Sequence, residues 1–340
     1  MDAVVLVGGF GTRLRPLTEQ IPKPMLPVGH VPMIERLIRR LGRGGVTDVV
    51  LALGFKPEPF HEAFPADRCG DVRVTYAVEP EPLDTAGAIR FAADTAGIDS
   101  TFVVANGDVM TDLDVGALVE AHRVAGAEAT IHLIGVEDPS AFGVVELVDG
   151  SESGGGRAGR IERFVEKPAP GTEPSNLINA GTYVFEPAVL ERIPAGRRVS
   201  IERDTFPELV EAGSMFGLAT VDYWIDAGVP DLYRAANLDL LSGDRVHDSC
   251  EAISPDASVD PGATLMNTIV GAGAVIESGT TVVDTVVLPG GFIGARAQVE
   301  SSLVMGRVEA DATVIEAIIG AEGVVAEGDH VAFDTVPAQQ

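Results

Sequence analysis

The sequence is poor in several kinds of residue, and each shortage narrows what the chain can be. Its 340 residues include only two cysteines, Cys69 and Cys250, whose wide separation fits neither a disulfide framework nor a metal or redox motif. No run of 18 or more apolar residues occurs, so we expect no membrane span. The N-terminus enters an apolar run without a basic flank or a cleavage site, so we expect a cytoplasmic protein with reduced thiols.

Basic residues are also scarce. The chain has 24 Lys and Arg against 51 Asp and Glu, a formal net charge of −27. This acidity argues against nucleic-acid binding, which needs a basic face. It also repels phosphorylated substrates at long range, so any phosphate chemistry must depend on local cations, a metal ion or both.

Up to about residue 135, short apolar runs alternate with amphipathic segments. The runs AVVLV, DVVLALG, VRVTYAV, TFVVAN and ATIHLIGV predict buried strands, and PMIERLIRRLGRGG, TAGAIRFAADTAG and LDVGALVEAHRVAG predict helices. This alternation predicts an α/β domain with a Rossmann-like, mixed and mostly parallel sheet. Further strand patterns follow (FGVVELV, RIERFVEKP and NAGTYVFE), and a last helix in VPDLYRAANLDLLSG ends the first domain, which we place at residues 1–243.

The last quarter of the chain has a different pattern. From Ile253 an aliphatic residue recurs every five or six positions, and the pattern repeats after 17 residues at Val270 and Val287. A hexapeptide repeat of this kind predicts a parallel β-helix, which we expect to be left-handed, over residues 244–340. A β-sandwich is the alternative, but sandwiches do not keep one period over three turns.

Hexapeptide-repeat proteins include acyltransferases, which need a histidine base beside the coils. Here only His247 and His330 flank the repeat, at its two ends. We therefore expect the β-helix to serve structure or assembly. Its terminal coils expose strand edges that need covering, which favours a homo-oligomer.

The stretch VLVGGFGTRLRPLTEQIPKPM, residues 5–25, joins a glycine cluster to a group of cations in an acidic chain. The glycines are Gly8, Gly9 and Gly11, and three basic residues, Arg13, Arg15 and Lys23, follow within eleven positions of each other. Leu14 stands where a dinucleotide-binding fingerprint needs its last glycine, and no Walker-type Gly-Lys-Ser/Thr follows. Glycines let backbone N–H groups approach an anion, and the added cations favour a polyphosphate. A solvated charged loop is the alternative.

GGFGTRLRPLT followed by PKPM resembles the signature of the sugar-1-phosphate nucleotidylyltransferases. Further motifs of that family follow in order: PLDTAGAI, NGDV, DPSAFGVVE, RFVEKP, INAGTYVF, SIERDTFPELV and YWIDAGVPDL. They most resemble the mannose-1-phosphate guanylyltransferase branch, and the similarity covers residues 1–335, including the β-helix. The resemblance implies Mg²⁺-dependent transfer of GMP from GTP to mannose 1-phosphate, giving GDP-mannose and pyrophosphate.

The resemblance also implies three sets of site residues. The nucleotide would lie on the backbone of Gly8, Gly9, Gly11 and Thr12, with Arg13 and Lys23 on its β- and γ-phosphates and Gly87 near the base. Asp108 and Asp226 would hold Mg²⁺ and, with the two cations, form the catalytic set. Gly143, Glu166, Lys167, Asn179 and Gly181 would bind the sugar phosphate. Because a sugar phosphate is already largely dianionic at neutral pH, no general base is needed, and the enzyme must supply positioning and charge neutralisation.

Two residues depart from the family pattern. Asp84 stands in place of the glycine in the usual PLGTAG, and Phe142 stands where many members have tyrosine. The base and the sugar therefore stay open, with thymidylyl, uridylyl or adenylyl transfer to glucose 1-phosphate or a cyclitol phosphate as the alternative. A non-catalytic subunit that senses nucleotide-sugars is a third hypothesis, but it predicts eroded catalytic residues, and all of those named above are present.

Overall fold

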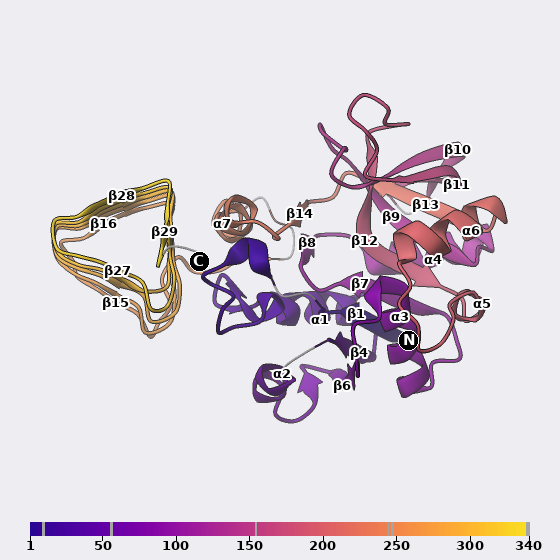
Figure 1. Cartoon of the computed structure of the whole chain (residues 1–340), viewed down its shortest axis with the longest axis horizontal. Coiled ribbons are helices and arrows are strands. Elements are labelled where there is room, and N and C mark those ends of the chain that lie inside the picture. Colours follow the sequence, from indigo (N-terminus) through magenta and orange to yellow (C-terminus); the bar gives the residue numbers. More distant parts are fainter. Residues whose placement is uncertain (9–10, 55–56, 154, 244, 246–247, 338–340) are drawn as a thin grey trace. The chain divides into compact units, whose positions relative to one another are not determined.

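The computed structural model describes residues 1–8, 11–54, 57–153, 155–243, 245 and 248–337 (Figure 1). The chain divides into two compact units, each built from two segments. The first unit consists of Met1–Gly9 and Glu35–Trp224, and the second of Phe10–Ile34 and Ile225–Gln340. In the described part of the chain, every helix is too short or too polar to span a bilayer.

The first unit is built on one large sheet. Its strands are β1 (Asp2–Leu6), β4 (Asp48–Leu53), β5 (Arg68–Cys69), β6 (Val72–Val78), β7 (Phe102–Asn106), β9 (Ala129–Gly135), β10 (Gly143–Ser153), β11 (Gly156–Glu166), β12 (Leu177–Phe185) and β13 (Met215–Thr220). They lie in the order β10-β11-β13-β9-β12-β7-β1-β4-β6-β5. β8 (Val109–Thr111) follows β7 outside this sheet, and β14 (Trp224–Asp226) leads into the second unit.

The sheet is mixed, as predicted, but parallel pairing is less general than expected. It joins β7-β1-β4-β6 and, separately, β9 and β13. The remaining neighbours are antiparallel. β10 and β11 form a hairpin, and β12 runs against both β7 and β9. β11 also runs against β13, and β5 runs against β6. The expectation of a mostly parallel sheet was therefore wrong outside the β7–β6 half, where crossover helices join successive strands.

Helices cover this sheet. They are α1 (Met33–Arg43), α2 (Glu58–Ala63), α3 (Asp84–Ala96), α4 (Val115–Ala125), α5 (Ala188–Glu191), the π-helix η3 (Ile201–Thr205) and α6 (Phe206–Glu211). The helices α1, α3 and α4 confirm the three amphipathic predictions. Apolar residues of α3 and α6 join one core with the sheet, where Phe206 packs edge-on against Tyr183 with ring centroids 5.3 Å apart.

The second unit contains residues 10–25 of the glycine-rich stretch, a helix and the repeat region. Its elements before the repeats are the 3₁₀ turns η1 (Thr12–Leu14) and η2 (Lys23–Met25), the strands β2 (Pro27–Val28) and β3 (Val31–Pro32), and α7 (Pro230–Leu238). Two hydrogen bonds join α7 to the residues that follow the stretch, since the Asn237 side chain accepts from Gly29 N at 2.8 Å and Tyr233 donates its hydroxyl to Pro27 O.

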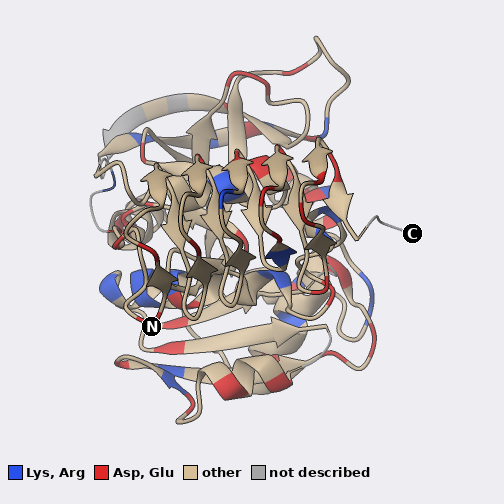
Figure 2. Cartoon of the chain, turned by 90° about the vertical axis from the view of Figure 1, so that its left-hand side faces the viewer, with Lys and Arg blue, Asp and Glu red and all other residues tan. Residues whose placement is uncertain are grey.

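The repeats form a parallel β-helix with three sheets of five strands (Figures 1 and 2). One sheet consists of β15 (Ser258–Val259), β18 (Val275–Ile276), β21 (Phe292–Ile293), β24 (Arg307–Val308) and β27 (Val324–Val325). The second consists of β16 (Thr264–Met266), β19 (Thr281–Val283), β22 (Gln298–Glu300), β25 (Thr313–Ile315) and β28 (His330–Ala332). The third consists of β17 (Ile269–Val270), β20 (Val286–Val287), β23 (Leu303–Val304), β26 (Ile318–Ile319) and β29 (Thr335–Val336).

The predicted period is confirmed by the register of these coils. Val270 pairs with Val287, 17 residues on, and both lie in the apolar interior of the β-helix. At one corner each coil has a non-glycine residue with positive φ: Asn267, Asp284, Ser301, Glu316 and Phe333. The Asn267 amide donates to Asp284 Oδ1 at 2.6 Å, so the side chains of these two successive corners bond along the stack. Short polar residues tolerate this left-handed conformation better than others.

Candidate functional site

The glycine-rich stretch of the second unit folds back on itself. Gly11 has a φ of +58°, and a Cβ there would lie 3.0 Å from Thr18 Cγ2 and 3.1 Å from Lys23 Cβ. The Thr18 hydroxyl donates to Gly11 O at 2.7 Å. This position therefore needs glycine for both its backbone conformation and its close packing. Gly9 lies outside the described residues, and no described atom comes within 4 Å of a Cβ built on Gly8.

Three of the four predicted catalytic side chains meet in this unit at Gly228. A Cβ on Gly228 would lie 2.7 Å from Asp226 Oδ1, 2.8 Å from Arg13 Nη2 and 2.9 Å from Lys23 Nζ. Lys23 is only 8% exposed, and its Nζ lies 3.8 Å from Asp226 Oδ1. A buried ammonium needs a nearby anion, which Asp226 supplies. The sequence argument missed Gly228, although it stands in the quoted motif YWIDAGVPDL.

The fourth, Asp108, belongs to the first unit and follows β7, as its motif predicted. The preceding Gly107 donates its N–H to Leu6 O at 2.8 Å, and a Cβ on Gly107 would lie 2.8 Å from that same oxygen. Glycine thus lets the end of β7 turn tightly over the end of β1. Burial is the main cause that raises the pKa of Tyr183, and the charge of Asp108 adds a smaller effect, so this carboxylate acts electrostatically on β12, which is described next.

Asn179, Gly181 and Tyr183 form a local network on β12. The Asn179 amide donates to the Tyr183 hydroxyl at 3.0 Å, and Asn179 Oδ1 accepts from Gly181 N at 2.9 Å. Gly181 has a φ of +76°, and a Cβ there would lie 2.8 Å from Asn106 Nδ2. The strand bulges here, which turns the Asn179 side chain back onto its own strand. Sequence reasoning missed Tyr183, whose only signal was its place in INAGTYVF.

Gly143 and Glu166 lie opposite each other in the β10–β11 hairpin. A Cβ on Gly143 would lie 2.5 Å from Phe164 Cζ and 3.1 Å from Glu166 Oε2, so only glycine leaves room for this carboxylate. The structure therefore brings this predicted pair into direct contact. The neighbouring Lys167 keeps its Nζ 3.8 Å from Glu166 Oε1.

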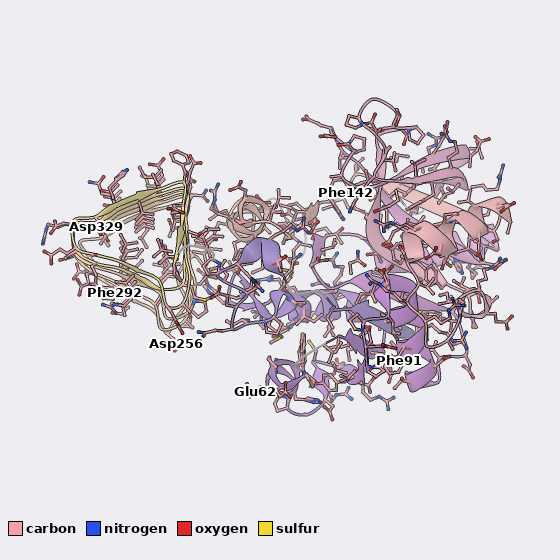
Figure 3. All side chains as sticks on the ribbon, in the orientation of Figure 1. Glu62, Phe91, Phe142, Asp256, Phe292 and Asp329 are labelled. Atoms are coloured by element: carbon pink, nitrogen blue, oxygen red, sulfur yellow. The ribbon has the colours of Figure 1, made fainter. Side chains whose placement is uncertain are left out.

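Lys167 has an unusual backbone. Its φ is +48°, and its N–H donates to Phe142 O at 2.9 Å. Strained conformations of non-glycine residues persist where the surroundings fix them, often at functional sites. Phe142, labelled in Figure 3, packs edge-on with Trp224 at 5.7 Å between ring centroids, and Trp224 donates its indole N–H to Ala180 O at 2.9 Å. The residue that departs from the family tyrosine is thus part of an aromatic pair.

A second carboxylate, Glu202 in η3, acts on Glu166. Burial is the main cause that raises the pKa of Glu166, and the negative charge of Glu202 raises it further, while Lys167 lowers it. Glu202 Oε2 accepts from the hydroxyls of Thr85 and Ser200, each at 3.0 Å. Glu202 was quoted within SIERDTFPELV but received no role from the sequence. It ties the segment around η3 to the start of α3.

Gly87 and Asp84 both lie in the first turn of α3. A Cβ on Gly87 would lie 2.5 Å from Arg197 O, and Val199 O accepts from the N–H groups of Ala86 and Gly87. Gly87 is thus needed for close packing against the segment that leads to η3. Asp84 has a φ of +61°, the conformation that glycine adopts most easily, and its carboxylate accepts from Thr85 N at 2.9 Å.

The described side chains offer few protein ligands for a metal ion. Among the described residues, no group of three or more His, Cys, Asp or Glu side chains gathers as a ligand cluster. Mg²⁺ commonly takes one or two carboxylates and completes its shell with water and substrate phosphates. Asp108 and Asp226 each carry hard oxygen ligands of this kind, so by its chemistry each side chain suits Mg²⁺.

Comparison with known proteins gives two family matches. The nucleotidyl transferase family model matches residues 2–243, and the model of a GlmU-like C-terminal hexapeptide region matches residues 254–339.

Individual relatives agree with these matches. The chain is 39% identical to a mannose-1-phosphate guanylyltransferase of Mycobacterium tuberculosis, over 81% of this chain and 76% of the relative. It is 41% identical to a mannose-1-phosphate guanyltransferase of Schizosaccharomyces pombe, over 78% and 73%. Among solved structures, HddC from Yersinia pseudotuberculosis, complexed with GMP-PN, matches with a TM-score of 0.58 and 29% identity, over 70% of this chain and 98% of that one. The resemblance seen in the sequence motifs is confirmed.

Proposed function

We propose, from the premise that the chain belongs to the nucleotidyl transferase family, that it is a mannose-1-phosphate guanylyltransferase. An oxygen of the phosphate of mannose 1-phosphate attacks the α-phosphorus of GTP. A new P–O bond forms there, the bond to the bridging oxygen of the β-phosphate breaks, and pyrophosphate leaves with the negative charge. The products are GDP-mannose and pyrophosphate.

The convergence of Arg13, Lys23 and Asp226 at Gly228 is the observation that carries this proposal. Two cations that both approach the point where a Cβ of Gly228 would lie, in a chain of net charge −27, form a local site for the β- and γ-phosphates. Arg13 and Lys23 then neutralise the charge that develops on the leaving pyrophosphate. The glycine backbone before them and Thr12 cradle the nucleotide.

We assign the sugar phosphate to the first unit. Glu166 accepts hydrogen bonds from sugar hydroxyls, for which its ionised form is the better acceptor, and Lys167 binds the phosphate. Gly143, Asn179 and Gly181 line the sugar pocket, since their packing leaves room for the carboxylate and fixes the amide. The phosphate of mannose 1-phosphate needs no proton removed at neutral pH, so binding and orientation suffice.

Enzymes of this family generally use a divalent metal ion. We propose Mg²⁺, with Asp108 and Asp226 as its protein ligands. When bound, the ion neutralises phosphate charge and makes the α-phosphorus more electrophilic. Lys23 balances the Asp226 carboxylate in the structure described here.

The nucleobase is the remaining part of the nucleotide. We place it near Gly87, at the start of α3, where the left-handed Asp84 replaces the glycine of the usual motif. The carboxylate of Asp84 lies 3.4 Å from Arg198 Nε, so the substitution adds an ion pair at this position.

A substrate panel tests the proposal. GTP, ATP, UTP and dTTP are each offered with mannose 1-phosphate, glucose 1-phosphate and a cyclitol phosphate, and the initial rate of pyrophosphate release is measured. GTP with mannose 1-phosphate should give the highest kcat/KM. A higher value for another pair would reject the assigned substrates, and an absence of pyrophosphate with every pair would reject the reaction.

A further inference from the structure

The third sheet of the β-helix is covered on its outer side. In each strand of this sheet one residue faces the interior, such as Val270 or Val287, and its neighbour faces outward. The outward residues Ile269, Val286 and Leu303 are nevertheless only 1–2% exposed. The other parts of the same unit supply the cover, since α7 packs on β20 and Arg234 donates to Asp284 O at 3.1 Å.

The glycine-rich stretch also touches the β-helix, at the turn between β26 and β27. A Cβ on Gly320 would lie 2.5 Å from Pro16 Cγ and 2.7 Å from Pro16 Cβ. Four residues further along the stretch, Gln20 Nε2 donates to Glu322 Oε1 at 3.1 Å. The two contacts attach the middle of the stretch to one turn of the coil.

The β-helix side of this contact is fixed by its own backbone. Gly320 N donates to Val336 O at 2.8 Å, and Gly323 N donates to Gly320 O at 2.8 Å. Pro16 is buried and its ring is rigid, so neither the Pro16 ring nor the Gly320 backbone can move easily. The residues between the two phosphate-binding cations are also anchored, since Leu14 and Leu17 are at most 1% exposed.

We propose that the turn Gly320–Glu322 is a positioning element for the phosphate-binding stretch. It rests on the proposed function, in which Arg13 and Lys23 hold the β- and γ-phosphates. Pro16 stands three residues after Arg13, and Gln20 stands three before Lys23. A displacement of the stretch at these contacts moves one or both cations relative to Asp226. The β-helix thereby contributes to triphosphate binding by the stretch that carries the two cations.

The test is Gly320→Ala in the full chain. The added methyl meets the Pro16 ring and must displace it, so we expect KM for GTP to rise or kcat to fall by about 10-fold or more, as misplaced catalytic groups do. KM for mannose 1-phosphate should change by less than about 2-fold, because the residues assigned to the sugar phosphate lie in the other unit. A general loss of stability would not produce this split.

Gly294→Ala is the matched control. Its Cβ would lie 2.7 Å from Ala310 N, a backbone clash of similar severity that stays within the β-helix. We expect it to lower the thermal midpoint and to leave KM for GTP unchanged in the folded fraction. Equal kinetic effects of the two alanines, or normal kinetics of folded Gly320→Ala, would overturn the proposal.

Gln20→Ala and Glu322→Ala are a second and less disruptive test. They test the positioning proposal even if Gly320→Ala does not fold. Each removes the same exposed hydrogen bond without a clash, and each should raise KM for GTP by about 2- to 5-fold, as the loss of one hydrogen bond does. Wild-type values for both would overturn the proposal. A wild-type protein that makes no GDP-mannose would instead contradict the proposed function alone.

Discussion

The substitution Gly228→Ala perturbs the candidate phosphate site most directly. Its methyl group would lie 2.7–2.9 Å from Asp226 Oδ1, Arg13 Nη2 and Lys23 Nζ, whereas ordinary van der Waals contact begins at 3.4 Å. Each polar atom must therefore retreat by roughly half an ångström or slightly more, which side-chain ends can do without unfolding the protein. Gly228 does not have a left-handed φ, so alanine fits its backbone.

The expected effect is a separation of activity from stability. Since a misplacement of about 1 Å can cost 10²-fold in rate, the smaller shift here should lower kcat/KM for GTP by about 10- to 100-fold. This loss corresponds to about 1.4–2.7 kcal/mol of transition-state stabilisation. The free energy of unfolding should stay equal or rise by up to about 1 kcal/mol, because alanine restricts the unfolded chain more than glycine does.

The assay is pyrophosphate release at varied GTP and saturating mannose 1-phosphate, with unfolding in urea measured alongside. Gly262→Ala serves as a control, because its Cβ would meet only Asp260 Oδ1 more closely than 3.4 Å, at 3.1 Å, in the β-helix. A folded Gly228→Ala protein with kcat/KM within about 2-fold of wild type would refute the assignment of these side chains to the triphosphate.

Three further substitutions test other parts of the account. Burial raises the pKa of Glu166, so its carboxyl favours folding in its protonated form and that contribution is lost as pH rises above the ordinary value of 4.5. Glu166→Gln should therefore be more stable than wild type at pH 7, by a margin that shrinks toward pH 4.5 in thermal melts, and should bind mannose 1-phosphate more weakly; a pH-independent margin would argue against the cause. Burial, and then the charge of Arg40, lower the pKa of His132 to about 3. Stability should consequently fall by about 1.4 kcal/mol per pH unit through this group as pH drops from 6.5 toward 3, and His132→Gln should flatten the slope in urea unfolding series. Tyr183→Phe removes the acceptor of the Asn179 amide and should cost about 1–3 kcal/mol of stability and raise KM for mannose 1-phosphate more than KM for GTP, with equal changes in both KM values contradicting the place given to Asn179.

Local patterns predicted the elements and the family well. The 17-residue period predicted the β-helix coils, because each coil is a short segment whose interior residues recur along the chain. The helical spacing of PMIERLIRRL predicted α1. These features depend on a few neighbouring residues, so they can be predicted from the sequence.

Features that depend on distant residues were not accessible. Gly228 matters because of Arg13 and Lys23, more than 200 residues away, and no local signal marks that contact. Glu202 is important because its negative charge adds to the rise that burial causes in the pKa of Glu166. The antiparallel insertion of β12 beside β7 also escaped the sequence reading, since strand direction is set by long-range pairing.

The grouping of the glycine-rich stretch with the β-helix has the same origin. The repeat period describes the coils alone and says nothing about what covers their third sheet. The contact of Pro16 with Gly320 joins segments about 300 residues apart. Only the folded chain shows that residues 10–34 and the repeats belong to one compact unit.

The most direct measurement of the central claim is the stoichiometry of the reaction, followed by ³¹P NMR with GTP, mannose 1-phosphate and Mg²⁺. The account predicts that GDP-mannose and pyrophosphate appear one for one as the two substrates disappear, and that added pyrophosphate drives the reaction back. Orthophosphate or free GMP in place of these products, or no change in any phosphorus signal, would contradict it.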